Sequence, residues 1–199
     1  SLERRSIMEA FGAKIILTNK DLGTQGSVDV ALKYVEEEGY FMPNQFANEN
    51  NLIAHLETTA EEIYGALDGK IDAFVAGVGT GGTISGTGRK LKSYNKDIEI
   101  VALEPESSPL ISKGTAGPHK LQGMGANFIP EILDQNVIDE VLRITNDEAY
   151  EMARKLATQE GIFAGVSSGA NIAGALKVAR KLGKGKTVVT VLPDTGERY

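Results

Sequence analysis

The chain has 199 residues and a formal net charge of −6; 41% of its residues are hydrophobic and 24% are charged. These values are typical of a soluble globular protein that holds one large domain, or one domain and part of another. No apolar run is long enough for a membrane span, the lack of cysteine excludes disulfides and cysteine-ligated metals, and the scattered basic residues provide no nucleic-acid-binding stripe.

The first part of the chain alternates helical and extended patterns. Residues 2–11 ("LERRSIMEAF") place apolar side chains on one helical face, and Gly12 ends the pattern. A short apolar strand is expected over 13–18, a second helix over 27–38 with Gly39 beyond its end, and a brief strand over 40–44.

The alternation continues with longer elements. Apolar side chains repeat at helical spacing over 51–67, and strands are predicted at 71–78 and 98–105, on either side of a helix at 83–94. The basic clusters "RKLK" (89–92) and "ARKLGKGK" (179–186), each near the expected end of a helix, are interpreted as solvated helix ends.

Residues 105–131 are rich in serine, glycine and proline, and a loop of this length inside a compact domain is usually functional. Regular elements then return, with Thr145 and Glu148 forming a capping box at the start of a helix. The remaining predicted elements are a strand at 137–144, helices at 145–161 and 167–183, and a buried strand at 186–194.

Apolar strands that alternate with helices predict an α/β fold, with an open and mostly parallel sheet covered by helices on both faces. The glycine-rich loop between the strand at 71–78 and the helix at 83–94 then lies at the carboxyl edge of the sheet. Proteins of this class bind ligands at that edge.

The loop lies within "VAGVGTGGTISG" (75–86), and two interpretations follow from its glycines. The spacing Gly77-x-Gly79-x-x-Gly82 matches the dinucleotide-binding fingerprint, and Glu104 at the end of the next strand is a candidate ribose ligand. Alternatively, the glycines serve only a tight structural turn.

A third interpretation is an anion-binding nest. The tract Gly79, Thr80, Gly81, Gly82 and Thr83 offers consecutive backbone N–H groups and two hydroxyls at the start of a helix. Such a nest suits a terminal phosphate monoester. The loop alone does not decide among the three interpretations.

A second hydroxyl-rich turn, "FAGVSSGAN" (163–171), precedes another predicted helix. Ser167 or Ser168 is either an N-cap residue or a second contact to the same ligand.

Six stretches, in the order given, resemble the fold type II (β-family) pyridoxal-phosphate enzymes, and within them the O-acetylserine sulfhydrylase family. They are "SLERRSIMEAFGAKIILT", "GVGTGGTISG", "EPESSPLI", "GPHKLQGMGANFIP", "EGIFAGVSSGAN" and "LPDTGERY". The resemblance runs the whole length of the chain.

The resemblance implies pyridoxal 5'-phosphate (PLP) as cofactor, with residues 79–83 around its phosphate and Ser167 hydrogen-bonded to its pyridine nitrogen. It places Gln45 near the substrate carboxylate and Gly123 in a loop beside the substrate. Glu104 is then an ordinary acid at a strand end, and neither histidine of the chain, His55 or His119, needs a catalytic role.

No lysine here lies in the family's Schiff-base motif, so no catalytic residue and no metal ligand is assigned. The resemblance implies a chain truncated at both ends, with 1–48 as the remainder of a small N-terminal α/β domain and 49–199 as a large cofactor-binding domain. We expect this piece alone to be inactive.

The resemblance also implies a cytoplasmic homodimer that replaces the acetate of O-acetyl-L-serine by sulfide to give L-cysteine, with serine acetyltransferase as a candidate partner. Cystathionine β-synthase-like chemistry is the alternative within the family. A nicotinamide oxidoreductase and a non-catalytic binding module are the alternatives outside it.

Overall fold

The computed structural model describes residues 2–199 and contains two compact units. One unit holds the chain up to Asn44 together with the last two residues, and the other is Gln45–Glu197. None of the helices within residues 2–199 has both the length and the apolar character that crossing a membrane requires.

The unit that begins the chain is helical. It contains α1 (Leu2–Ala10), the short 3₁₀ helix η1 (Lys20–Leu22) and α2 (Gly23–Glu38). Gly39 ends α2 in the left-handed conformation, as predicted. The strands predicted at 13–18 and 40–44 are wrong, because neither segment has a described neighbouring strand to complete a hydrogen-bonded ladder.

The larger unit is built on a parallel sheet in the order β3-β2-β1-β4. Its strands are β1 (Ala73–Gly77), β2 (Glu99–Pro105), β3 (Glu140–Ile144) and β4 (Val188–Thr190). The predicted α/β class with a parallel sheet is confirmed.

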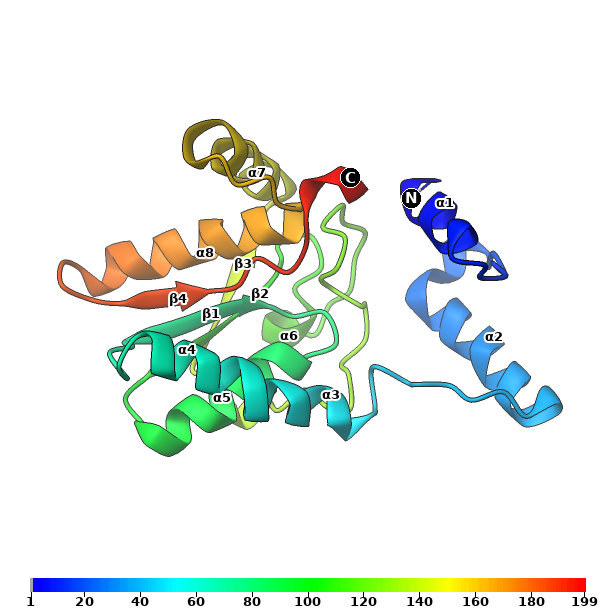
Figure 1. Cartoon of the computed structure of the whole chain (residues 1–199), viewed down its shortest axis with the longest axis horizontal. Coiled ribbons are helices and arrows are strands. Elements are labelled where there is room, and N and C mark those ends of the chain that lie inside the picture. The colour runs from blue at the N-terminus through cyan, green and yellow to red at the C-terminus, as the bar shows by residue number, and fades with distance from the viewer. Residues whose placement is uncertain (1) are drawn as a thin grey trace. The chain divides into compact units, whose positions relative to one another are not determined.

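Helices cover both faces of this sheet, as Figure 1 shows. On one face lie α7 (Asn146–Glu160) and α8 (Val166–Leu182). On the other lies α5 (Gly82–Tyr94), beside a long helical segment. Side chains alternate along each strand, so Val75 joins the core under α8 while Phe74 joins the core under α5.

The long helical segment was predicted as one helix over 51–67. It consists of α3 (Glu49–Ala54), the π-helical turn η2 (His55–Thr59) and α4 (Ala60–Ala66). The apolar periodicity is that of a helix throughout, so the wider turn in its middle leaves no clear trace in the sequence pattern.

The region after β2 is mostly irregular, as predicted, and includes the one-turn helix α6 (Leu110–Lys113) and the 3₁₀ turn η3 (Gln135–Val137). A last 3₁₀ turn, η4, spans Gly196–Arg198. The capping box of Thr145 and Glu148 is present at the start of α7.

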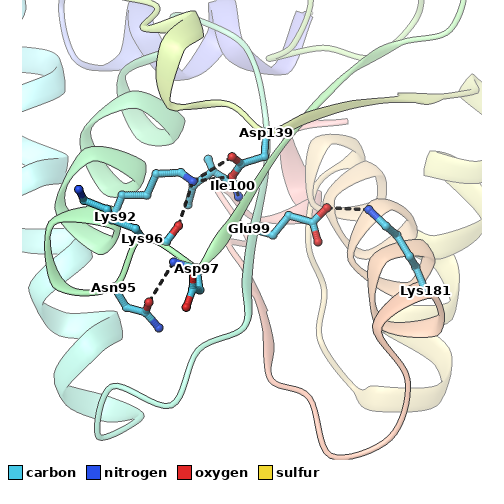
Figure 2. A network of polar contacts seen from close by, with 8 residues as sticks. All are labelled: Lys92, Asn95, Lys96, Asp97, Glu99, Ile100, Asp139 and Lys181. Carbon is cyan, nitrogen blue, oxygen red and sulfur yellow. Dashed lines mark hydrogen bonds and ion pairs between the residues drawn. The ribbon is translucent and has the colours of Figure 1, made fainter.

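Ion pairs fasten the helices to the amino ends of the strands, as Figure 2 shows. Lys92 of α5 lies 2.8 Å from the carboxylate of Asp139, which also accepts a hydrogen bond from the Ile100 amide at 2.7 Å. Lys181 of α8 pairs with both Glu140 and Glu99, and these hydrogen bonds raise the pKa of the lysine. Lysines at both helix ends are therefore paired and not merely solvated.

The strand order creates a switch point beside β1. The chain moves outward from β1 to β2 and β3, then returns through α8 to place β4 on the other side of β1. Open parallel sheets bind ligands at the carboxyl ends of the strands that flank such a switch. The glycine loop leaves β1 at this place.

Asn171 of α8 joins the two strands that flank the switch point. Its Oδ1 accepts from the Gly77 amide and its Nδ2 donates to the Val191 carbonyl, both at 2.8 Å, and the residue is 2% exposed. One side chain thus satisfies a backbone donor of one segment and a backbone acceptor of the other.

We expect Asn171→Leu in the full-length protein to lower the free energy of unfolding by about 2–6 kcal/mol, because two backbone groups lose their partner at about 1–3 kcal/mol each. Urea unfolding followed by circular dichroism measures the change. The same substitution at the exposed Asn50 is the control and should change little. Equal stability of Asn171→Leu and its parent would contradict the assignment.

Candidate functional site

The glycine loop turns directly from β1 into α5. Val78 is anchored by a hydrogen bond from its amide to the Leu103 carbonyl, and α5 starts at Gly82. Gly81 is the N-cap residue, with a φ of 88° that disfavours any residue with a side chain. The sequence therefore forms a sharp turn that leads from the strand into the helix within four residues.

We call residues 79–83 the cup. Among residues 2–199, the amides of Gly79, Thr80, Gly81 and Thr83 donate to no protein acceptor. The remaining amide, that of Gly82, donates to Thr80 Oγ1 at 3.3 Å. Free amides at the N-terminus of a 13-residue helix form a site for an anion.

Close packing around the cup explains its glycines. A Cβ added to Gly79 would overlap the carbonyl oxygen of Gly123, and one added to Gly82 would overlap the side chain of Asn51. The backbone itself forms the walls of the cup, so its donors can approach a ligand without intervening side chains.

The hydroxyl of Thr80 is oriented by two donors. Asn51 Nδ2 donates to Thr80 Oγ1 at 3.1 Å, as does the Gly82 amide. Since both contacts use the oxygen as an acceptor, the hydroxyl proton of Thr80 is available to a ligand.

The same Asn51 side chain connects the cup to Gln45. Its Nδ2 donates to the Gln45 carbonyl at 2.9 Å, which fixes the segment ahead of α3 next to the cup. The side chain of Gln45 is exposed. The backbone at Gln45 is therefore tied to the cup through one residue.

Ser167 lies in the first turn of α8 and is 5% exposed. The N-cap residue of α8 is Gly165, so the interpretation of Ser167 or Ser168 as an N-cap is wrong. The Gly165 amide donates to the Asp194 carbonyl, and the Gly165 carbonyl accepts the first helical hydrogen bond, from the Gly169 amide. The N-cap therefore lies two residues before Ser167.

The structure brings Ser167, Gly123 and the cup together. A Cβ on Gly123, whose φ is 89°, would lie 3.7 Å from Ser167 Oγ. The carbonyl of Gly123 in turn contacts Gly79. Among the described residues, Ser167 Oγ forms no hydrogen bond, so it can serve a ligand between these loops.

Glu104 is not available as a ribose ligand. Its carboxylate is 2% exposed and accepts from the Ile111 amide at 2.7 Å and from the amide and hydroxyl of Ser112. These contacts hold α6 against the end of β2. The interpretation of the glycine spacing as a dinucleotide-binding motif therefore lacks the ribose ligand that it requires.

Sequence reasoning missed two side chains that contact the cup, Asn51 and His55. His55 Nε2 lies 3.2 Å from Thr83 Oγ1, and burial lowers the pKa of the imidazole. A usable signal existed, because polar residues recur every four positions at 51, 55 and 59 along one helical face.

Known proteins match the chain along its whole length. The family model described as pyridoxal-phosphate dependent enzyme matches residues 1–194. A cysteine synthase from Staphylococcus aureus is 52% identical over 200 residues, which cover 100% of this chain and 64% of the relative. The chain thus spans about 64% of the length of the curated relatives it matches.

Solved structures agree with this match. A cysteine synthase from Entamoeba histolytica is similar at a TM-score of 0.93 and 44% identity, covering 100% of this chain and 60% of that one. A hydrogen sulfide-producing enzyme from Fusobacterium nucleatum is similar at a TM-score of 0.96 and 44% identity, covering 100% and 68%.

Proposed function

Because this chain belongs to the family of pyridoxal-phosphate dependent enzymes, we propose that the full-length protein is a cysteine synthase. The reaction proposed is replacement of the acetate of O-acetyl-L-serine by sulfide, which yields L-cysteine. The observation that carries the proposal is the cup, whose four free amides and oriented Thr80 hydroxyl suit a phosphate monoester. The cysteine synthase relatives support the choice of reaction.

The residues present fit the cofactor. We propose that residues 79–83 hold the phosphate of PLP and that Ser167 Oγ donates its proton to the pyridine nitrogen. Three observations support this assignment: the Ser167 hydroxyl has no partner among the described residues, it is buried, and it lies beside Gly123. When bound, PLP supplies an electron sink for the substrate carbanion.

The substrate contacts proposed for this chain are Gln45 and Gly123. Asn51 holds the Gln45 backbone next to the cup, and Gly123 lies between the cup and Ser167. Both positions therefore border the volume that the cofactor would occupy. In this proposal Gln45 and Gly123 orient the amino-acid substrate, and the cofactor stabilises the charge that develops on it.

The wider organisation is also a proposal. We propose that residues 1–48 belong to a small domain and 49–199 to the large cofactor-binding domain, in a cytoplasmic homodimer. Serine acetyltransferase is the proposed protein partner. Size-exclusion chromatography with light scattering, alone and with that enzyme, tests the assembly.

The activity is tested on the protein expressed from its complete reading frame. With PLP, O-acetylserine and sulfide, we expect stoichiometric cysteine and acetate. Replacing sulfide by homocysteine tests the cystathionine β-synthase-like alternative. Faster turnover with homocysteine than with sulfide would favour that alternative, and no turnover with either would contradict the proposed function.

Removing either threonine hydroxyl of the cup should weaken cofactor binding. We expect Thr80→Val and Thr83→Val each to raise the dissociation constant for PLP about 10- to 100-fold, because a hydrogen bond to a charged group contributes about 1.5–3 kcal/mol. Equilibrium dialysis measures the constant. Thr158→Val is the matched control, since that hydroxyl is exposed and donates to the Arg154 carbonyl on α7. Unchanged affinity in both cup variants would contradict the phosphate assignment.

A further inference from the structure

A chain of three side chains leads away from the cup into the neighbouring helical segment. Thr83 Oγ1 lies 3.2 Å from His55 Nε2, and His55 Nδ1 lies 3.0 Å from Thr59 Oγ1. His55 and Thr59 are four residues apart, so they lie on the same helical face. Among residues 2–199, the side chains of His55 and Thr59 form hydrogen bonds only with each other and with Thr83, so packing alone does not explain these two residues.

The backbone around His55 holds it at close range. The Ala60 amide donates to the His55 carbonyl five residues earlier, which is the wider π-helical hydrogen bond of η2. On α5, a Cβ at Gly86 would overlap the Leu52 carbonyl oxygen, so the two helices pack backbone against backbone there. This contact brings the imidazole up to Thr83, one turn earlier on α5.

The surroundings of the imidazole favour its uncharged form. Burial lowers its pKa, and among residues 2–199 no charged side chain contacts its ring nitrogens. A neutral imidazole carries one N–H and one acceptor nitrogen. The hydrogen-bond chain can therefore run in only two directions, from Thr59 toward the cup or from the cup toward Thr59.

We propose that Thr59 and His55 are positioning residues that direct the hydroxyl proton of Thr83 into the cup. Thr59 donates to Nδ1, the Nε2–H of His55 donates to Thr83 Oγ1, and the single proton of Thr83 is left for the phosphate. In the opposite direction the Thr83 hydroxyl would donate its proton to Nε2 of His55. Only the lone pairs of Thr83 Oγ1 would then face the phosphate. The inference rests on the proposed function, because it requires a phosphate in the cup.

Thr59 is suited to start the chain, whereas its neighbour is not. Among the described residues, the Thr59 hydroxyl has no hydrogen-bond partner other than His55. The Thr58 hydroxyl donates to the Ala54 carbonyl at 2.7 Å and is exposed. Two adjacent threonines of one π-helical turn thus provide a test residue and its matched control.

The direction of the hydrogen-bond chain is determined by which ring nitrogen of His55 carries the hydrogen. Nitrogen NMR of the full-length protein with PLP bound, labelled at histidine, should show a hydrogen on Nε2 of His55 and a bare Nδ1. A hydrogen on Nδ1 with a bare Nε2 would overturn the proposal. The Thr59→Val variant should shift the Nδ1 resonance, because that nitrogen loses its donor.

Cofactor affinity tests whether the chain acts through Thr83. We expect Thr59→Val to raise the PLP dissociation constant about 3- to 10-fold, the range of one ordinary hydrogen bond. Thr59→Ser, which keeps the hydroxyl, should restore the parental value, and Thr58→Val should not change it. In a Thr83→Val background, Thr59→Val should have no further effect.

Two affinity results would count against the proposal. An equal loss of affinity from Thr59→Val with and without the Thr83 hydroxyl would make Thr59 a structural residue only. Parental affinity in Thr59→Val would show that the chain does not direct the proton. A full-length protein that binds PLP with these differences but makes no cysteine would contradict the proposed reaction and leave the positioning role intact.

Discussion

Gly79→Ala is expected to remove most cofactor binding from the full-length protein. The added methyl group would overlap the backbone carbonyl of Gly123, and backbone cannot move aside as a flexible side chain can. Either loop must shift, which withdraws at least two amides from the phosphate. At about 1.5 kcal/mol or more for each hydrogen bond to a charged group, the PLP dissociation constant should rise about 100-fold or more.

The matched control for this prediction is Gly65→Ala. Gly65 lies within α4, and a Cβ there would meet no atom within 4 Å. We expect unchanged PLP affinity and a gain in unfolding free energy of about 0.5–1 kcal/mol, because alanine stabilises a helix relative to glycine. A Gly79→Ala protein that binds PLP as its parent does would contradict the close approach of the two loops.

At Ser167, two substitutions are expected to have very different effects. A neutral hydroxyl donates to the pyridine nitrogen without protonating it, so Ser167→Ala loses one hydrogen bond and about 10-fold in rate at most. In Ser167→Asp a carboxylate would raise the pKa of the pyridine nitrogen and hold it protonated. We expect that variant to lose about 100-fold or more in the rate of acetate release, which is about 2.7 kcal/mol of activation free energy.

The measurement pairs the rate of acetate release with thermal unfolding of each variant. Ser168→Ala is the control, because the Ser168 hydroxyl is buried with no partner in the described part of the chain and its removal should cost no stability. An aspartate variant as active as the parent would contradict the assignment of Ser167 to the pyridine nitrogen.

The sequence predicts best what depends on local patterns. The capping box at Thr145, the left-handed glycine after α2 and the strand–loop–helix turn at residues 79–83 are all set by neighbours in the chain. Segments whose conformation depends on distant partners are predicted less well. Residues 13–18 have the composition of a strand, yet in the structure they have no ladder to join.

The candidate site follows the same division. The cup is contiguous, so its glycines and threonines are visible in a single stretch. Asn51 and His55 reach it only because a second helix packs against α5, with Gly86 allowing the close approach. The spacing of Asn51 and His55 predicts that they share one face of a helix, but it does not predict which element that face contacts.

The N-termini of two helices define the site, because the cup opens α5 and Ser167 lies in the first turn of α8. No residue of the cup has an ionisable side chain. A phosphate held there would be retained by donors that do not titrate, and its own second ionisation, with a pKa of about 6, would set how retention varies with acidity. Above that pKa, protonation of the cup does not change how strongly it binds the phosphate of the cofactor.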